Sequence, residues 1–398
     1  MALLAVATIL QLSACTAPTG QPQGVHNGPQ PPSPLQQPAA VPPAAPPPEA
    51  ISPPPAETAT AGRQKVALLV PLTGPNKSVG QALLDAADMA LFDVSADLAL
   101  LPRDTGSTQD NARAAATKAV EDGAAIILGP VFSASVPSVE EAVRGLPINV
   151  IAYSTDANVA GGNVFVMGFL PAGQVERVVE FAKSRGMSKL AALVPDNPYG
   201  VAVKNEIGAI IGRLGMPPPQ ILTLGRDPKA QIASLADNPP EMLLVALGGE
   251  QLQNLAPAIG EFTAAHPVQL LGTGLWDDPA VAQNPALAGG WYAAPVPANF
   301  ADFAARFQKT YNYRPPRIAT LAYDSVALAV SVSKQATSGA TPFSRDLLLQ
   351  PNGFSGIDGG FRLLPDGLSE RNLAILALGP NGPTVVDPPP PTFEKLGE

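Results

Sequence analysis

The side chains that most often carry chemistry in proteins are scarce in this chain of 398 residues. The single cysteine, Cys15, excludes an intramolecular disulfide and a zinc site built from several thiolates of one chain. The two histidines, His26 and His266, leave little for histidine-based catalysis. The sequence has no GxSxG, HExxH, GxGxxG or P-loop pattern and offers no nucleophile–base pair. We therefore expect neither an enzyme nor a metal or cofactor site.

The charge balance argues against another class of function. The chain has 24 basic and 33 acidic residues, which gives a formal net charge of −9. A protein that binds the phosphates of a nucleic acid needs a basic surface. We therefore expect no nucleic-acid partner, whereas the 46% of hydrophobic residues suffices for a sizeable core.

Cys15 is the residue whose surroundings point to a specific modification. Residues 2–12 form an almost wholly apolar run, shorter than the ~20 residues that a membrane-spanning helix needs. The run ends in Leu12-Ser13-Ala14-Cys15, which resembles the lipobox of bacterial lipoproteins. No Lys or Arg precedes the run, so either translation starts further upstream or the export signal is weak. We expect residues 1–15 to be a lipoprotein signal peptide with Cys15 lipidated. In the lipoproteins that this motif resembles, an Asp after the cysteine is associated with retention at the inner membrane, so the resemblance and Thr16 together imply the outer membrane and leave the inner membrane open.

A proline-rich segment follows at residues 16–62. Residues 17–60 contain 15 prolines, and Glu49 and Glu57 are their only charged side chains. Such a composition cannot bury enough apolar surface to fold. We expect a disordered, semi-stiff tether that holds the following domain away from the membrane.

The remainder of the chain alternates between apolar runs and helical patterns. Residues 65–70 are a continuous apolar run, which is typical of a strand buried on both faces of a parallel sheet. Residues 80–94 repeat apolar side chains with the period of a helix. Further strands are expected at 99–101, 124–128, 148–152, 190–194 and 242–247, and a helix at 111–121. This alternation predicts βαβ units in an α/β fold.

The length of the folded region, residues 63–386, is too great for one open sheet, so we expect two doubly wound α/β lobes. The chain is expected to cross between them near 169–171, 295–297 and 352–353. The first lobe would be 63–169 and 297–350, the second 170–296 and 351–386, and the tail 387–398. Because ligands of open α/β sheets bind at the carboxyl ends of the strands, we expect a cleft between the lobes.

Several short motifs follow one another in an order and spacing that resemble those of a known family. They are Val70-Pro71-Leu72-Thr73-Gly74-Pro75, Gly129-Pro130 followed by Ser133 and Ser135, the run 148–154, Tyr199-Gly200 and Ala322-Tyr323-Asp324. Together they resemble the type I periplasmic binding proteins of the leucine/isoleucine/valine-binding branch. With the lipobox and tether, residues 353–367 further resemble bacterial lipoproteins of the penicillin-binding protein activator group. The best-studied members of that group carry an extra helical-repeat domain, in place of which this chain has the proline-rich segment.

The resemblance implies a ligand site with two opposed devices. Hydroxyls and backbone N–H groups at helix N-termini would hold a carboxylate, and the candidates are Thr73, Gly74, Ser133, Ser135, Ser154 and Thr155. An acid beside an aromatic ring would hold an ammonium group, and the candidates are Tyr199, Glu250, Trp276 and Asp277. Gly74 could instead serve only a turn, and Trp276 could be packed in the core. Where the family has its acid this chain has Gly274, and Asp156 replaces a usual threonine. We therefore expect no tight binding of a standard free amino acid.

These features predict a lipid-anchored protein at the periplasmic face of the outer membrane. Its expected role is to regulate peptidoglycan synthesis through contact with a penicillin-binding protein. The alternative is the substrate-binding protein of an ABC importer for amino acids or a related small solute. A polar cleft that takes a small-molecule ligand favours the importer, whereas an apolar or blocked cleft favours the regulator.

Overall fold

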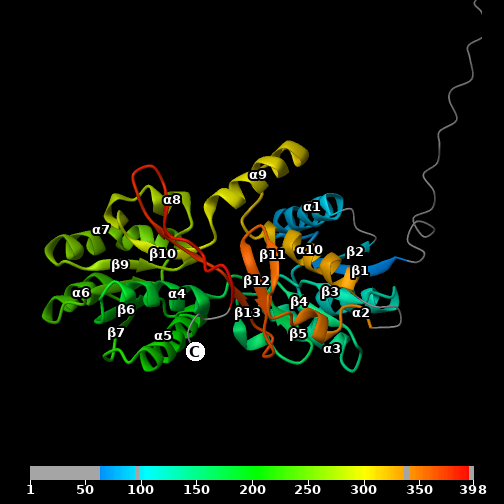
Figure 1. The fold of residues 1–398 in the computed structure, drawn as a ribbon, viewed down its shortest axis with the longest axis horizontal. Coiled ribbons are helices and arrows are strands. Elements are labelled where there is room, and N and C mark those ends of the chain that lie inside the picture. Colours follow the sequence, from blue (N-terminus) through cyan, green and yellow to red (C-terminus); the bar gives the residue numbers. More distant parts are fainter. Residues whose placement is uncertain (1–62, 95–97, 336–340, 394–398) are drawn as a thin grey trace, which may run out of the picture. The chain divides into compact units, whose positions relative to one another are not determined.

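The structure is a computed structural model of the full chain and describes residues 63–94, 98–335 and 341–393 (Figure 1). The predicted lipobox with Cys15 and the predicted tether, residues 16–62, lie outside the described residues. The described residues all belong to one structural unit.

The first sheet is parallel and has the strand order β2-β1-β3-β4-β5. Its strands are β1 (Gln64–Val70), β2 (Leu98–Asp104), β3 (Ile126–Leu128), β4 (Asn149–Ala152) and β5 (Val164–Val166). In β1, Val66 and Leu68 pack in one core layer with α1 (Lys77–Asp93) and α10 (Ala319–Gln335). Ala67 and Leu69 point to the opposite face and pack with α2 (Gln109–Glu121) and α3 (Val136–Ala142). Both faces of β1 are therefore buried, which explains its continuous apolar sequence.

The second sheet has the strand order β15-β14-β10-β9-β8-β6-β7, antiparallel only at β10-β14-β15. Its strands are β6 (Leu190–Val194), β7 (Gln220–Thr223), β8 (Met242–Val245), β9 (Gln269–Gly272), β10 (Trp291–Ala294), β14 (Ala374–Ala377) and β15 (Thr384–Asp387). Leu193 packs in a layer with α6 (Pro228–Ser234) and α7 (Gly249–Ala265). Ala192 and Val194 pack on the other face with α4 (Pro171–Ser184) and α5 (Pro198–Leu214). The predicted fold of two doubly wound α/β lobes is thus confirmed.

The chain passes between the lobes where these elements change sheets. The first crossover joins β5 to α4, and the second joins β10 to α9 (Pro297–Tyr311), whose Phe303 and Phe307 pack in the first lobe. Shorter helices are α8 (Pro279–Ala282) and α11 (Arg345–Leu348). Single turns of 3-10 helix are η1 (Ser133–Ser135), η2 (Ala157–Val159), η3 (Leu235–Asp237), η4 (Gly274–Trp276) and η5 (Pro285–Leu287).

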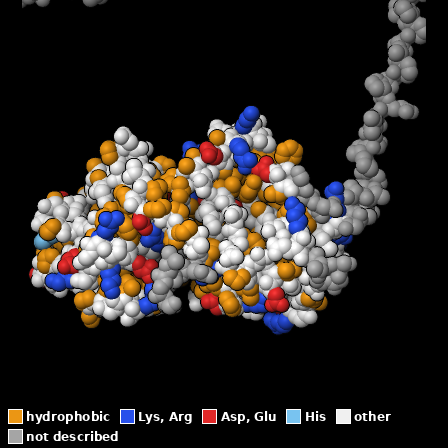
Figure 2. Space-filling view, viewed as in Figure 1, with side chains coloured by type: hydrophobic (Ala, Val, Ile, Leu, Met, Phe, Trp, Pro, Cys, Tyr) orange, Lys and Arg blue, Asp and Glu red, His pale blue; other side chains and the backbone are white. Residues whose placement is uncertain are grey.

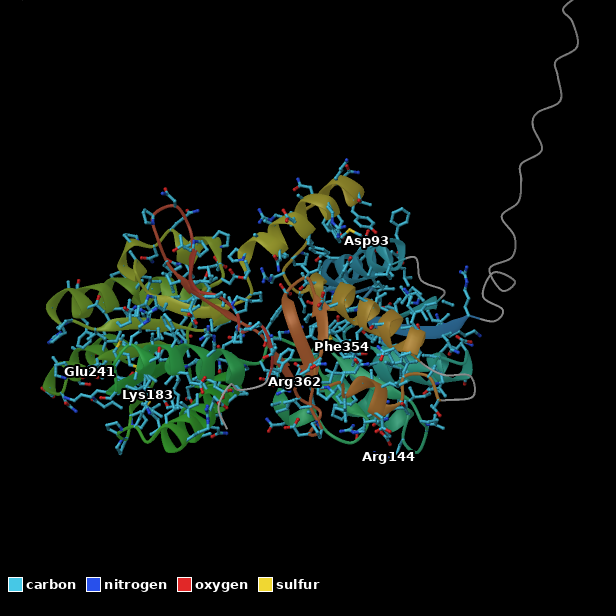
Figure 3. The ribbon with its side chains drawn as sticks, in the orientation of Figure 1. Asp93, Arg144, Lys183, Glu241, Phe354 and Arg362 are labelled. Carbon is cyan, nitrogen blue, oxygen red and sulfur yellow. The ribbon has the colours of Figure 1, made fainter. Side chains whose placement is uncertain are left out.

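A third, antiparallel sheet changes the predicted lobe boundary. It consists of β11 (Phe354–Gly356), β12 (Gly359–Leu363) and β13 (Ser369–Arg371), drawn in orange and red beside α10 (Figure 1). Phe354, labelled in Figure 3, and Phe361 are buried in the core of the first lobe. Residues 351–371 therefore pack with the first lobe, and the third crossover lies between β13 and β14 rather than near 352–353.

The end of the described chain also packs against the domain. The predicted tail, 387–398, begins with the last residue of β15, Asp387, which pairs with Arg177 of α4. Phe393 is buried, and the guanidinium of Arg362 in β12 lies 5.0 Å from its ring centre. This part of the chain joins β15 of the second lobe to the sheet that packs on the first.

Candidate functional site

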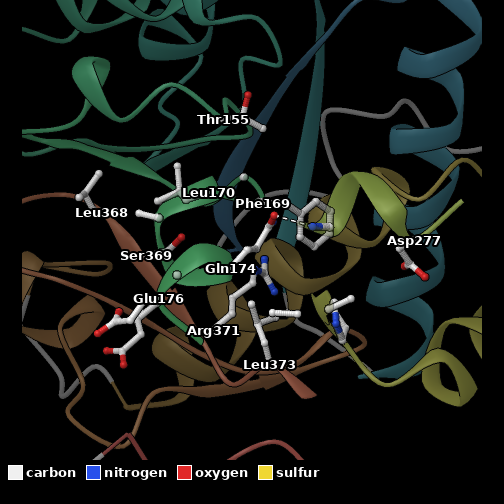
Figure 4. Close-up of a pocket in the computed structure, with 18 of the residues that line it drawn as sticks. Thr155, Phe169, Leu170, Gln174, Glu176, Asp277, Leu368, Ser369, Arg371 and Leu373 are labelled. Atoms are coloured by element: carbon white, nitrogen blue, oxygen red, sulfur yellow. Dashed lines mark hydrogen bonds between the residues drawn. The ribbon is translucent and has the colours of Figure 1, made fainter. Parts of the chain in front are cut away.

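A cavity of about 1090 Å³ lies where the chain crosses between the lobes (Figure 4). We call it the hinge pocket, and each crossover contributes to its lining: Phe169 and Leu170, then Ala294 and Pro295, then Arg371 and Leu373. Ligand pockets of proteins usually enclose about 300–1,000 Å³. The hinge pocket therefore has room for a small molecule larger than one amino acid.

Three of the predicted site residues line the hinge pocket, namely Thr155, Tyr199 and Asp277. Tyr199 lies in the first turn of α5, where the Asn197 side chain caps the helix by accepting from the Gly200 N–H at 3.0 Å. Its hydroxyl donates to Thr273 Oγ1 at 2.8 Å. Burial raises the pKa of Tyr199 to about 12, so the ring carries a neutral phenol.

Gln174, which the sequence analysis did not single out, lies in the first turn of α4 and is buried. Its Oε1 accepts a hydrogen bond from the Gly274 N–H at 2.7 Å, the dashed line in Figure 4. A Cβ added at Gly274 would lie 3.0 Å from Gln174 Nε2 and 3.1 Å from Oε1. At the position where the resemblance implies an acid, this chain therefore has a glycine that makes room for the Gln174 amide.

Arg317, in the turn before α10, connects acids of both lobes. Its Nη1 lies 3.3 Å from an oxygen of Asp277, and its Nη2 lies 2.7 Å from Oδ1 of the fully buried Asp358. Asp358 also accepts a hydrogen bond from Thr320. Burial raises the pKa of Asp277, although Arg317 opposes that shift. The predicted ammonium-binding acid is thus already paired within the protein.

Arg371, at the end of β13, is one of three arginines that line the pocket, with Arg317 and Arg362. Its guanidinium lies 5.1 Å from the ring centres of both Phe169 and Phe361. Nη2 donates to the Met167 carbonyl at 3.1 Å, and Nη1 lies 3.7 Å from Oδ2 of the fully buried Asp324. Burial raises the pKa of Asp324 to about 7, although the positive charge of Arg371 opposes that shift.

Thr73 and Gly74 do not line the hinge pocket. The Thr73 hydroxyl donates to Asp104 Oδ2 at 2.5 Å, and the same carboxylate accepts from the backbone N–H groups of Leu72 and Thr73. Although partial burial acts against it, these hydrogen bonds lower the pKa of Asp104. Gly74 adopts a φ of +79°, which fits a turn. This loop therefore joins the ends of β1 and β2, and the Thr73 hydroxyl already has a partner in Asp104.

The predicted serines also lie outside the pocket lining. Ser133 begins η1 and is half-buried, whereas Ser135 is buried and directly precedes α3. Ser154 is buried, and its Oγ accepts from the Asp156 N–H at 2.9 Å. These side chains support the loops that follow β3 and β4.

Glu250 and Trp276 do not line the pocket either. Glu250 is exposed in the first turn of α7, where a negative charge favours the helix. Trp276 is fully buried in the core of the second lobe, and a Cβ at Gly272 would lie 2.2 Å from its ring. The structure therefore assigns Trp276 to packing rather than to the cleft.

The residues that the sequence analysis missed, Gln174, Arg317 and Arg371, are single polar side chains within or beside regular elements. The only sequence signal was a charged residue directly before an apolar strand, in Arg371-Asn372-Leu373-Ala374. Among the described residues, no group of three or more His, Cys, Asp or Glu side chains could hold a metal ion. No helix in the described ranges is long and apolar enough to cross a bilayer.

Two α/β lobes joined by crossovers, with a pocket at the hinge, define the class of two-lobed binding proteins. The sequence matches the family described as periplasmic binding protein over residues 63–373, and the chain belongs to that family.

Solved structures with the same fold include binding and regulatory proteins. A Rhodospirillum rubrum protein described as a branched-chain amino-acid ABC transporter is 18% identical, with a TM-score of 0.72 over 81% of this chain and 100% of its own. The C-domain of LpoA (YraM) from Haemophilus influenzae, a regulator of PBP1A, is 15% identical, with a TM-score of 0.65 over 81% of this chain and 100% of its own. LivJ from Streptococcus pneumoniae, in complex with isoleucine, is 17% identical, with a TM-score of 0.55 over 82% of this chain and 100% of its own.

Among curated proteins, the uncharacterized protein RP748 of Rickettsia prowazekii is 27% identical over 147 residues. The match covers 37% of this chain and spans only 39% of that protein.

Proposed function

We propose that this protein is a lipid-anchored periplasmic regulator of peptidoglycan synthesis that acts by contact with a penicillin-binding protein. In this proposal Cys15 carries the anchor at the outer membrane and the proline-rich segment provides reach. The binding-protein domain then presents a surface to the synthase and favours its active conformation. No chemical step is required of the domain itself.

One observation carries the proposal. Neither the predicted hydroxyl groups for a ligand's carboxylate nor the predicted acid for its ammonium group forms a complete binding site. The Thr73 hydroxyl donates to Asp104, so its proton is not available to a ligand carboxylate. Asp277 is paired with Arg317, which also binds Asp358 of the other lobe. A free amino acid would have to compete with these contacts at both of its ends, which disfavours a receptor for amino acids.

Two further observations agree with a regulator. The regulatory LpoA domain shares this fold over the whole of its own length. On the face drawn in Figure 2, basic and acidic side chains are interspersed and form no large basic patch, which agrees with a protein partner rather than a nucleic acid.

The test asks whether this protein co-purifies with a penicillin-binding protein and activates it. The full chain, with its anchor in detergent, is mixed with purified bifunctional penicillin-binding proteins of the same cell, and glycan polymerisation and peptide cross-linking are measured. We expect one synthase to be retained and its cross-linking rate to rise, with bovine serum albumin as the inert control. Neither retention nor activation of any synthase, at tens of micromolar protein, would contradict the proposal.

The second candidate function is that of a solute receptor for an importer, and the volume of the hinge pocket favours it. Isothermal titration calorimetry of the full chain against the standard amino acids distinguishes the two. Binding of leucine or a similar amino acid at micromolar concentration would support the receptor and count against the regulator. Absence of heat with all of them is what the regulator requires.

A further inference from the structure

The chain makes a fourth connection between the lobes after its last strand. β15 ends at Asp387 in the second sheet, and four prolines, Pro388 to Pro391, lead from there to Phe393. Phe393 is 8% exposed and packs against the third sheet, which belongs to the first lobe. We call residues 388–393 the strap. Unlike the three crossovers, the strap holds the first lobe by non-covalent contacts alone, so this connection can be released without cutting the chain.

Arg177 of α4 fixes the end of the strap that lies in the second lobe. Its Nη2 pairs with Asp387 and donates to the Pro388 carbonyl at 3.1 Å. Its Nε donates to the carbonyl of Leu373, in the third crossover, at 3.0 Å. One guanidinium thus ties the beginning of the strap to the third crossover, and the strap starts from a fixed point beside the hinge.

The end of the strap that lies in the first lobe is a socket for the Phe393 ring. A Cβ at Gly353 would lie 2.8 Å from Phe393 Cε2, and one at Gly360 would lie 3.6 Å from Cζ. The Arg362 guanidinium, 5.0 Å from the ring centre, also donates from Nη2 to the Phe393 carbonyl at 3.4 Å. Glu370 holds that guanidinium through a 2.7 Å ion pair. Two glycines therefore make room for the ring, and one arginine holds it in place.

The prolines between the two ends suit a strap rather than a core. Pro388, Pro390 and Pro391 are exposed, so packing does not explain the run of prolines. Because each proline fixes its own φ, the segment loses little conformational freedom when Phe393 is seated. From Pro388 to Phe393 the chain can span at most about 18 Å. The strap therefore orders at low entropic cost and sets an upper limit on the distance between its two anchors.

We propose that the strap limits the opening of the two lobes, with Phe393 as its releasable anchor. While the ring is seated, β15, the strap, β12, β13 and the third crossover form a closed ring of contacts that spans both lobes. A movement of the lobes that separates Arg177 from the socket must first pull Phe393 out of it. The equilibrium between seated and released strap then sets how much of the protein has open lobes. The inference concerns this chain alone and holds with or without a penicillin-binding partner.

The first test measures the distance distribution between the lobes by electron spin resonance. Nitroxide labels are placed at two exposed sites, Arg144→Cys in the first lobe and Lys229→Cys in the second, in the full chain with Cys15→Ser. We expect one narrow distribution in this parent protein. In Phe393→Ala we expect a second population at a different distance, above about 10% of the molecules. Thr392→Ala, which alters an exposed side chain of the same strap, is the matched control and should keep the narrow distribution.

The Arg317–Asp277 ion pair also joins the lobes, so Phe393→Ala is measured both alone and together with Asp277→Ala. Phe393 belongs to neither of the large core clusters of the two lobes, so these variants should fold. If Phe393→Ala changes the distance distribution in neither background, the strap does not limit opening and the inference is wrong.

A glycine variant separates the stiffness of the strap from its anchor. Pro389→Gly, Pro390→Gly and Pro391→Gly together keep the length of the strap and its Phe393. The flexible segment loses more entropy when the ring is seated, so we expect a second population between those of the parent and Phe393→Ala. A population no larger than the parent's would refute the role of the prolines.

Hydrogen exchange locates the opening and distinguishes it from a general loss of stability. In Phe393→Ala, amides of the crossover peptides 167–170 and 371–374 should exchange about tenfold or more faster than in the wild type. Amides of β1 and β6, within the two cores, should keep their rates. Equal acceleration in β1 and β6 would mean that the variant is merely less stable, and would overturn the inference. No penicillin-binding protein takes part in these measurements, so the two proposals fail separately.

Discussion

Arg317 Nη1 lies 3.3 Å from Asp277 Oδ2. This ion pair joins the turn before α10 in the first lobe to the loop after β9 in the second. The same guanidinium binds Asp358, whose side chain is fully buried, whereas Asp277 retains 21% of its side-chain exposure. One arginine thus holds two acids in very different surroundings.

This difference predicts unequal effects on stability. Removing one partner of a buried ion pair costs about 3 kcal/mol or more, whereas an ion pair that solvent partly reaches contributes less than about 1 kcal/mol. We expect Asp358→Ala to lower the free energy of unfolding by about 3 kcal/mol and Asp277→Ala by less than about 1 kcal/mol. Urea unfolding of both variants checks this, and equal losses would contradict the assignment of Asp358 as the structural partner.

Asp324 predicts how stability depends on pH. Burial raises its pKa from 3.8 to about 7, so the folded protein keeps a proton that the unfolded chain has lost. Its contribution to stability therefore falls as pH rises from about 4 to about 7, by about 1.4 kcal/mol per pH unit, and is constant above that range.

Asp324→Asn removes this titration and keeps the shape of the side chain. The free energy of unfolding of the wild type relative to the variant, from denaturant titrations between pH 4.5 and pH 8, should decline and then level off near pH 7. Parallel curves for the two proteins would show that Asp324 is not protonated in the folded state.

Gly272 and Gly212 form a matched pair for core packing. A Cβ at Gly272 would lie 2.2 Å from the buried Trp276 ring, whereas one at Gly212, on the exposed face of α5, meets nothing within 4 Å. We expect Gly272→Ala to cost about 3 kcal/mol of stability and Gly212→Ala to add up to about 1 kcal/mol. Chemical unfolding measures both, and a neutral Gly272→Ala would place the indole elsewhere.

Cys15 predicts acylation, and the test is independent of the fold. In cells fed an alkyne analogue of palmitate, the wild type should be labelled and should partition into the membrane fraction. Cys15→Ser should lose both properties because serine provides no thiol for the acyl linkage. Labelling that persists in the serine variant would refute the lipobox.

Most of the strands that the sequence predicted are buried on both faces, although β2 is a half-buried edge strand and the short buried strands β5 and β14 were missed. β1, β6 and β8 are continuous apolar runs because helices cover both sides of their sheets. β7 is only half-buried along its length and gave no such signal. In β11–β13 only one face packs on the core, the strands are short, and β11 and β12 contain glycine.

The third crossover shows where local sequence fails. Asn352-Gly353 indicates a turn, but a turn does not reveal which core the next strand joins. Packing of Phe354 and Phe361 in the first lobe moved the crossover to the end of β13. The same shift brought Arg371 into the hinge pocket, and for that reason it was missed.

The sequence by itself determined the alternating α/β architecture, the two lobes and the family, because burial on both sides of a sheet leaves a periodic record in the chain. It also predicted Tyr199 and Asp277 as site residues, because they follow strands and so lie at the carboxyl edge of the second sheet. Only the tertiary structure decided which polar groups are free. Whether Thr73, Asp277 or Gln174 can meet a ligand depends on partners 31, 40 and 100 residues away, Asp104, Arg317 and Gly274, and no local pattern encodes such contacts.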